Sequence, residues 1–467
     1  MLLHDTLTRT DRPLHPLDGK TLRIYCCGPT VYGPAHIGNF RTFVVQDVFR
    51  RTVELGGTPT LHVRNITDVD DKTIRDSQKA GQTLGSFTAE WTAKFHADCE
   101  ALNLLRPHVE PSAVAHIPHQ IAMIEKLMAS GHAYKAEDGS VYFKVGAFHE
   151  YGALSHLEKR EIRLGAAQTD SDEYSKESMA DFALWKARKD EDGVNFWASP
   201  WGEGRPGWHL ECSAMILEYL GTEFDLHSGG VDLIFPHHEN EIAQSCCSTG
   251  GKFASHWFHI AHLMVDGGKM SKSLGNLFTL ADLQAKGYTA AEVRYVLISG
   301  HYRAPLNFTF HTLDSARQAL QKLAKHEASL RAKYGAGGAP KYDDLIRHGS
   351  AGVFADAWAL LTNDLNVPGA LGAVFGAIKD ADSTAFDVET AKSRWMDLHF
   401  VLGALGVILP EAQPDAEAPA EVVALAEQRW AAKQSKDWAA ADKFRDELAA
   451  LGWTTKDSKT EYKLIPL

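Results

Sequence analysis

The chain has 467 residues, of which 44% are hydrophobic and 23% are charged, and its formal net charge is −12. This composition is typical of a soluble globular protein, and the length corresponds to about three domains. The negative charge disfavours a nucleic-acid-binding protein, although a local basic face remains compatible with it. No apolar run reaches the roughly 20 residues that span a bilayer, and the N-terminus lacks a basic segment followed by an apolar stretch. We therefore expect no secretion signal, no membrane partner and a cytoplasmic location.

The N-terminal part predicts a parallel α/β unit. Residues 22–27 form a predicted buried strand, which a Gly-Pro pair ends. A helix is predicted after residue 36, because apolar side chains recur every three to four positions from Phe40 to Val48. Residues 60–66 predict the next strand. A strand, a helix and a strand with short links are typical of a parallel sheet.

The rest of the chain predicts an insertion and a helical region. The insertion combines a helix at 117–130, a strand at 140–145 and a polar stretch at 169–178, and strands resume at 223–227 and 257–265. Further on, Leu313, Ala316, Leu320 and Leu323 form one apolar helix stripe. The predicted fold is α/β, with a Rossmann-like parallel-sheet catalytic domain carrying an insertion, then a helical bundle and a small C-terminal module. The predicted boundaries are 1–115 and 205–265 for the sheet domain, 116–204 for the insertion, 266–310 for a connecting region with a lysine loop, 311–409 for the bundle and 420–467 for the module.

Two short segments together predict an ATP site. The first, His36-Ile37-Gly38-Asn39, lies at a predicted helix N-terminus, where backbone N–H groups and the helix dipole favour phosphate. Gly38 permits close approach of a nucleotide, and His36 and Asn39 can donate hydrogen bonds to phosphate oxygens. The second, residues 269–273 (KMSKS), offers Lys269 and Lys272 to stabilise charge while the α-phosphate is attacked. Each segment alone is more often a turn or a solvated face, so their combination carries the prediction.

Four further residues form a candidate zinc set. The six cysteines are too sparse for a disulfide framework, so each is interpreted as a core residue or a metal ligand. Cys27 ends the first strand, Cys212 precedes an apolar stretch, and His237 and Glu241 share a helix face at a spacing of four. Thiolate, imidazole and carboxylate suit zinc, but spacing alone also allows ordinary packing. For the other four cysteines packing is the expected role, and Cys26 faces away from Cys27 if both lie on a strand.

These motifs resemble class I aminoacyl-tRNA synthetases. The general resemblance rests on residues 27–32 (CGPTVY), 36–39 (HIGN) and 269–273 (KMSKS). Three more segments narrow it to the cysteinyl-tRNA synthetase family: 64–72 (RNITDVDDK), 207–213 (GWHLECS) and 235–241 (FPHHENE). The resemblance is strongest between residues 20 and 310 and returns at 364–368 (DLNVP) and near 436–451. Two departures are visible: Asn39 stands where the class usually has a second histidine, and the terminal pattern differs at 461–463.

The resemblance implies a two-step reaction. The carboxylate of L-cysteine attacks the α-phosphate of ATP, supplied with Mg²⁺, and the resulting cysteinyl-adenylate is transferred to tRNA(Cys). It also implies one zinc ion per chain, held by Cys27, Cys212, His237 and Glu241, which binds the substrate thiol and rejects the hydroxyl of serine. The implied amino-acid pocket and tRNA-binding regions complete this set: Thr67, Trp208, His227 and Asp232 for the pocket, and the helical bundle with residues 420–467 for tRNA. A monomer is expected.

Four other functions share part of this sequence pattern. The nearest is a cysteine ligase that joins activated cysteine to an amino sugar, which has less need of the long helical region. A zinc deaminase matches His237 and Glu239 but lacks the downstream Pro-Cys-x-x-Cys. A His-Glu-x-x-His protease is disfavoured, because residue 242 is isoleucine where the second histidine would stand. An inactive RNA-binding relative conflicts with the retained lysines and candidate ligands.

Overall fold

The structure is a computed structural model that describes residues 1–157, 181–270, 275–335, 337–379, 381, 385–413, 418–457 and 461–466. The polar stretch at 169–178 and Lys272 lie outside these residues. The chain forms two compact units, Met1–Pro410 and Glu411–Leu467, which are described separately. Among the described residues, no helix combines the length and the apolar composition needed to cross a bilayer.

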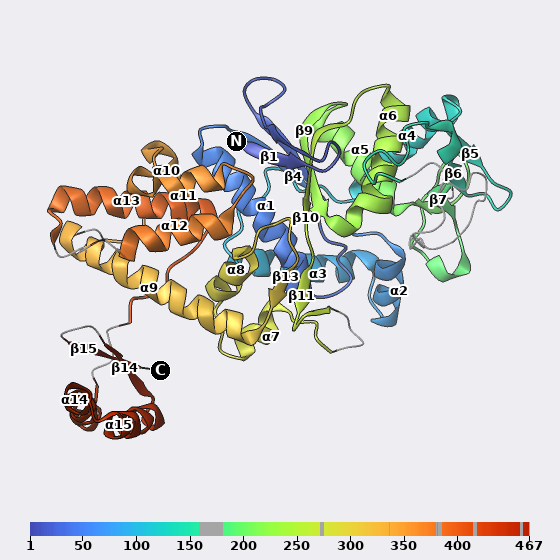
Figure 1. Cartoon of the computed structure of the whole chain (residues 1–467). Coiled ribbons are helices and arrows are strands. Elements are labelled where there is room, and N and C mark those ends of the chain that lie inside the picture. The colour runs from blue at the N-terminus through green and yellow to red at the C-terminus, as the bar shows by residue number, and fades with distance from the viewer. Residues whose placement is uncertain are drawn as a thin grey trace. The chain divides into compact units, whose positions relative to one another are not determined.

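A four-stranded parallel sheet forms the centre of the first unit (Figure 1). Its strand order is β10-β9-β3-β4, with all neighbours parallel. The chain runs outward from β3 to β4 and later returns to the other side of β3, so the order reverses between β3 and β9. This reversal is where open α/β sheets bind ligands, outside the carboxyl ends of their strands. The four strands are β3 (Leu22–Cys26), β4 (Thr60–Arg64), β9 (Phe224–Gly230) and β10 (Ala254–Ile260).

Helices cover both faces of this sheet. Helix α1 (Ile37–Leu55) joins β3 to β4, and its Phe40 packs with Ile24 and Cys26 of β3 in one core. Tyr25 and the adjoining Cys27 belong to a second core with α5 (Trp208–Leu220). Successive side chains of a strand point to opposite faces, so the prediction that Cys26 and Cys27 face opposite ways is confirmed. Helix α6 (Glu239–Thr249) packs beside α5.

The insertion between β4 and β9 contains a second, antiparallel sheet. Helices α2 (Asp71–Lys79) and α3 (Leu84–Ala101) follow β4, and α4 (Ile117–Ala129) then leads into the sheet, as its predicted range of 117–130 indicated. The sheet order is β5-β6-β7-β8. Its strands are β5 (Ala133–Lys135), β6 (Val141–Phe143), β7 (Phe182–Ala187) and β8 (Gly204–Pro206).

The predicted single strand at 257–265 is two strands. After Ile260 the chain leaves the parallel sheet, the N–H of Ala261 donates to the carbonyl of Tyr302, and β11 pairs with β13 instead. An apolar run cannot reveal this change of partner, because both pieces are buried. The sequence also gave no sign of the N-terminal hairpin of β1 (Leu2–Asp5) and β2 (Thr10–Pro13). The elements that follow are β11 (Leu263–Val265), β12 (Gly268–Lys269), α7 (Leu280–Ala285), α8 (Ala290–Ile298) and β13 (Leu306–Phe308).

A helical region completes the first unit. The predicted stripe of α9 (Phe310–Tyr334) is buried at all four positions, Leu313, Ala316, Leu320 and Leu323. Arg294 of α8 fastens this region to α1: its guanidinium contacts Asp47 of α1 at 2.5 Å and the carbonyl of Leu405 at 2.9 Å. The remaining helices are α10 (Tyr342–His348), α11 (Ala355–Leu361), α12 (Val367–Lys379) and α13 (Val388–Leu405). The predicted fold class, a parallel-sheet domain with an insertion followed by helices, is confirmed.

The second unit is a helix pair with a hairpin. Val422 and Leu448 from the two helices pack with Trp453 of the hairpin in a small core. Asp457 accepts hydrogen bonds from Arg429 and Lys433, which ties the hairpin to the first helix. The elements are α14 (Ala420–Gln434), α15 (Trp438–Ala450), β14 (Trp453–Asp457) and β15 (Tyr462–Pro466).

Candidate metal centre and nucleotide site

The four predicted metal ligands meet at the reversal of strand order. Cys27 directly follows β3, and Cys212 lies in the second turn of α5. His237 lies in the short helical turn Ile234–His238 that leads into α6, and Glu241 lies in the first turn of that helix. Their donor atoms all lie within 4.8 Å of one another, and all four residues are buried. The structure therefore brings together residues that are up to 214 positions apart.

Short contacts fix the arrangement of these donors. The imidazole Nε2 of His237 lies 2.8 Å from Oε1 of Glu241, and Sγ of Cys27 lies 3.8 Å from the same oxygen. Two sulfurs, one nitrogen and one carboxylate oxygen form a donor set that zinc accepts in tetrahedral sites. Sulfur ligands disfavour magnesium and calcium, which prefer oxygen. The chemistry of the donors thus fits the predicted metal.

The cluster carries separated charges. Burial raises the pKa of the Cys212 thiol, but a hydrogen bond from Cys27 and the nearby His237 more than offset it and lower the pKa to about 6. Burial works against a charge on His237, yet Glu241 and then Cys212 raise its pKa to about 10. Burial likewise opposes ionisation of Glu241, whereas His227 and His237 hold its pKa at about 2. The directions of the Cys212 and Glu241 shifts favour a thiolate and a carboxylate, which are the forms that bind a metal cation.

Three further histidines contact these donors and orient them. The Nε2 atom of His227 lies 2.6 Å from Oε2 of Glu241, and Nδ1 of His209 lies 3.0 Å from Nδ1 of His237. His238 places Nε2 at 3.3 Å from Sγ of Cys27. Partners of this kind fix the orientation of metal-binding side chains. Cys27, His227, His238 and Glu241 also form a second group whose donor atoms lie within 4.8 Å.

Three of the four predicted pocket residues border the cluster. The ring of Trp208 lies 4.3 Å from that of His237, centroid to centroid, and is half-buried. Thr67 follows β4 and donates its hydroxyl at 2.5 Å to Glu211, which precedes the candidate ligand Cys212. His227 is fully buried and contacts the candidate ligand Glu241. Asp232 is exposed, in the short turn Val231–Leu233 that follows β9.

The predicted phosphate-binding turn is the N-terminus of α1. His36 is the N-cap residue, and its Nδ1 accepts from the N–H of Asn39 at 3.1 Å. In return Oδ1 of Asn39 accepts from the N–H of His36 at 3.1 Å. Asparagine thus completes a capping box here, a role that the sequence interpretation missed. Its amide oxygen faces the cap, which directs the exposed –NH₂ group elsewhere as a donor.

The described residues on either side of the lysine segment lie beside this turn. The N–H of Ile37 donates to the carbonyl of Phe278 at 2.9 Å, and His36 forms a β-bridge with Thr279. A Cβ atom at Gly38 would lie 3.2 Å from Sδ of Met270, the residue after Lys269. Lys269 itself is exposed on β12. Lys272, the other predicted lysine, lies outside the described residues.

Two buried acids near the cluster have roles that spacing did not reveal. Glu239, which the deaminase alternative required as a proton carrier, accepts backbone hydrogen bonds from Gly152 and Ser155 at 2.8 and 2.9 Å and so holds the insertion. Glu211 holds Thr67. The sequence interpretation did not predict these hydrogen bonds, because the two residues that each one joins lie at least 84 positions apart.

Comparison with known proteins identifies the family. A family model described as tRNA synthetases class I (C) catalytic domain matches residues 13–318. A cysteine–tRNA ligase from Opitutus terrae is 54% identical, with 99% of this chain and 98% of the relative aligned. The enzyme of that name from Chlamydia trachomatis serovar A is 43% identical over 100% of both chains.

Solved structures show the same fold at low identity. A methionyl-tRNA synthetase from Mycobacterium tuberculosis, in complex with methionyl-adenylate, has a TM-score of 0.59 and 15% identity, and it covers 83% of this chain and 91% of its own. At this identity the likeness concerns the fold alone. Together with the full-length relatives, the chain belongs to the cysteine–tRNA ligase family of class I tRNA synthetases.

Proposed function

We propose that this protein activates L-cysteine with ATP and transfers it to tRNA(Cys) through cysteinyl-adenylate. The proposal rests chiefly on the buried Cys27, Cys212, His237 and Glu241 cluster in a chain whose full-length relatives are cysteine–tRNA ligases. A thiol-specific metal site is what an enzyme needs to select cysteine over serine. The alternative acceptor, an amino sugar, has no support from these relatives.

The nucleotide would bind at the N-terminus of α1. The N–H groups of His36, Ile37 and Asn39 already donate within the protein, so phosphate would be attracted by the His36 ring and by the positive end of the helix dipole. Gly38 would let the nucleotide approach the backbone. Asn39 would contribute its amide –NH₂ group, since its oxygen already accepts from His36. Lys269 and Lys272 would stabilise the charge that develops on the α-phosphate, with Mg²⁺ accompanying the ATP.

The amino acid would bind against the cysteine-rich cluster. Zinc held by the four donors would supply a Lewis acid for which a thiolate is a good ligand and a neutral hydroxyl a poor one. Trp208 would form an apolar wall, and Asp232 would pair with the ammonium group. His227 would act indirectly, by holding Glu241 in place through the 2.6 Å contact.

This metal chemistry explains why shape recognition is not required. Packing differences between similar small side chains provide only about 1–3 kcal/mol of discrimination. A thiol and a hydroxyl differ far more in their affinity for zinc than in size. Selection at the first step would make a separate editing site unnecessary.

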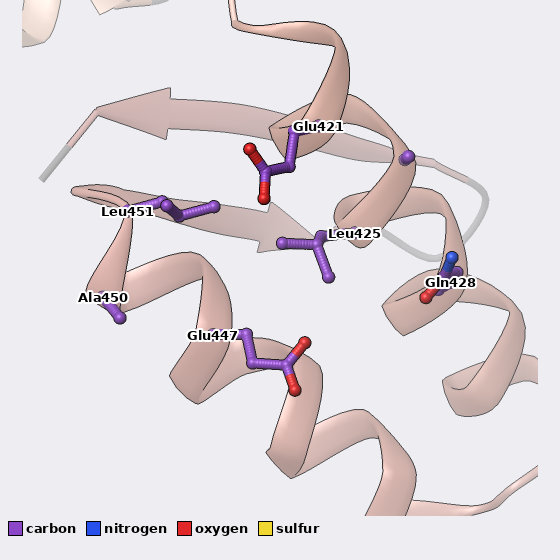
Figure 2. Close-up of a pocket in the computed structure, with 7 residues that line it drawn as sticks. Glu421, Leu425, Gln428, Glu447, Ala450 and Leu451 are labelled. Atoms are coloured by element: carbon purple, nitrogen blue, oxygen red, sulfur yellow. The ribbon is translucent and has the colours of Figure 1, made fainter.

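Each predicted domain would have its own part in this reaction. Residues 1–115 and 205–265 would form the catalytic domain, 116–204 an inserted domain, and 266–310 the connecting region with the lysine loop. The helices in 311–409 and the module in 420–467 would contact tRNA. Within that module, one groove is a poor surface for phosphates: a cavity of about 450 Å³ is flanked by Glu421 and Glu447 (Figure 2).

The decisive experiment is aminoacylation of total tRNA with cysteine and serine compared, alongside elemental analysis of the purified protein. We expect cysteine to be attached to tRNA(Cys), serine to be rejected, and about one zinc per chain. Activation of cysteine without transfer to any tRNA would support a different acceptor. A metal-free protein that still rejects serine would contradict the role given to the cluster. A monomer and a cytoplasmic location remain predictions, which sedimentation and cell fractionation test.

A further inference from the structure

Two buried side chains fix the hydroxyl of Thr67 in one orientation. Its Oγ1 donates to Oε1 of Glu211 at 2.5 Å and accepts from Nδ2 of Asn65 at 3.0 Å. Thr67, Glu211 and Asn65 are 2%, 2% and 1% exposed. These three residues adjoin the candidate metal cluster, because Glu211 directly precedes the proposed ligand Cys212 in sequence.

The orientation of the Asn65 amide is also determined. Its Oδ1 accepts from the backbone N–H of Gly28 at 2.8 Å, so the opposite end of the amide must be the –NH₂ group that faces Thr67. Gly28 is part of the same loop as Cys27. A Cβ atom at Gly28 would lie 1.6 Å from the carbonyl oxygen of Asn65, so the two loops are in direct contact.

The two hydrogen bonds of the Thr67 hydroxyl leave it able to form only one more, as an acceptor. A hydroxyl has one proton and two lone pairs. Glu211 takes the proton and Asn65 uses one lone pair, so the remaining lone pair can only accept. This result does not depend on the ionisation of Glu211, because a carboxyl group with its proton on Oε2 still accepts at Oε1.

We infer that Glu211 and Asn65 are positioning residues that hold Thr67 as an acceptor for the α-ammonium group of the bound amino acid. The inference rests on the proposed function. Cysteine offers three polar groups, of which the carboxylate only accepts, and the thiol loses its proton when it binds zinc. The ammonium group is the one donor left, and it therefore matches an acceptor-only hydroxyl.

The test compares three thiols that bind the zinc-loaded protein: cysteine, cysteamine, which lacks the carboxylate, and 3-mercaptopropionate, which lacks the amine. Their dissociation constants are measured by calorimetry for the wild type and for Thr67→Val, Thr67→Ser and Glu211→Gln. Thr88→Val is the matched control, because Thr88 is also buried and donates its hydroxyl to a helix carbonyl, that of Leu84. Zinc content and melting temperature are measured for every variant.

We expect Thr67→Val to weaken cysteine and cysteamine by roughly 10- to 150-fold, the range for a hydrogen bond to a charged group, and to leave 3-mercaptopropionate unchanged. Thr67→Ser should restore most of this affinity. Glu211→Gln should show the same ligand pattern with a smaller loss, because its amide can also donate to Thr67 and release the hydroxyl proton. Thr88→Val should change none of the three constants.

Two ligand patterns would overturn the inference. An equal loss for all three thiols would mean that Thr67 and Glu211 only maintain the fold of the pocket. A loss confined to cysteine and 3-mercaptopropionate would mean that the hydroxyl donates to the carboxylate. If the wild type binds none of the thiols, the proposed function fails with it; if the wild type binds and activates cysteine but either pattern appears, only this inference fails.

Discussion

Replacing Cys212 by serine tests the central chemical claim about the cluster. The side chain is buried, and its donor atom lies within 4.8 Å of those of Cys27, His237 and Glu241. The serine hydroxyl fits the same space but keeps its proton at neutral pH, so it replaces a thiolate ligand with a weak neutral one. We therefore expect Cys212→Ser to lose zinc and cysteine selectivity together.

The size of both losses can be worked out. Structural zinc sites bind with about 10–16 kcal/mol at neutral pH, which is roughly 2.5–4 kcal/mol for each of four ligands. Loss of one ligand then weakens zinc binding by roughly 10²- to 10³-fold. Without zinc, the preference for cysteine over serine should fall to the roughly 10- to 200-fold that pocket shape provides.

The assay combines elemental analysis after dialysis against a chelator with pyrophosphate exchange driven by cysteine or serine. Cys246→Ser is the matched control, since Cys246 lies on α6 with Glu241 but outside the cluster. It should retain metal and selectivity. Wild-type zinc affinity in Cys212→Ser, or a metal-free variant that still prefers cysteine by more than roughly 10³-fold, would refute the reasoning.

Three further predictions concern the surroundings of the site. Lys272→Ala should lower kcat for cysteine activation by roughly 10²- to 10³-fold and change the KM for ATP less; the reverse split in steady-state exchange kinetics would reject its role. Gly28→Ala should lower kcat/KM for cysteine by roughly 10²-fold, because its Cβ would meet the Asn65 carbonyl and displace the loop; unchanged kinetics would show that the loop adapts. Asp47→Asn should cost about 3–5 kcal/mol of unfolding free energy at pH 7, since it leaves Arg294 buried without its carboxylate partner. Burial raises the pKa of Asp47, but the neighbouring guanidinium groups outweigh it and lower the pKa from 3.8 to about 2. The part of the wild type's advantage that depends on the ionised carboxylate, roughly 2.5 kcal/mol, should therefore be complete above about pH 5 and be lost as the pH falls through about 2, and a pH-independent difference in urea unfolding would contradict this.

Local patterns in the sequence were sufficient for the elements around the nucleotide turn. The spacing of apolar residues predicted α1 and the strands on either side of it, and the period of two placed Cys26 and Cys27 on opposite faces. These features depend on neighbours within a few positions, and local backbone geometry decides them. Residues 257–265 form one apolar run, although β10 and β11 pair with different strands. The sequence pattern therefore could not predict where the run divides into two strands.

The sequence by itself determined which residue types are available for zinc and nucleotide chemistry, because the motifs carry those residues in a fixed order. Only the tertiary structure decided which side chains meet. The reversal of strand order between β3 and β9 brings Cys27 within 3.8 Å of Glu241, although 214 positions separate them. It also decided that His227 contacts Glu241 and that Glu211 orients Thr67. Hydrogen bonds across such separations depend on how the sheet and its helices pack, and no local spacing records them.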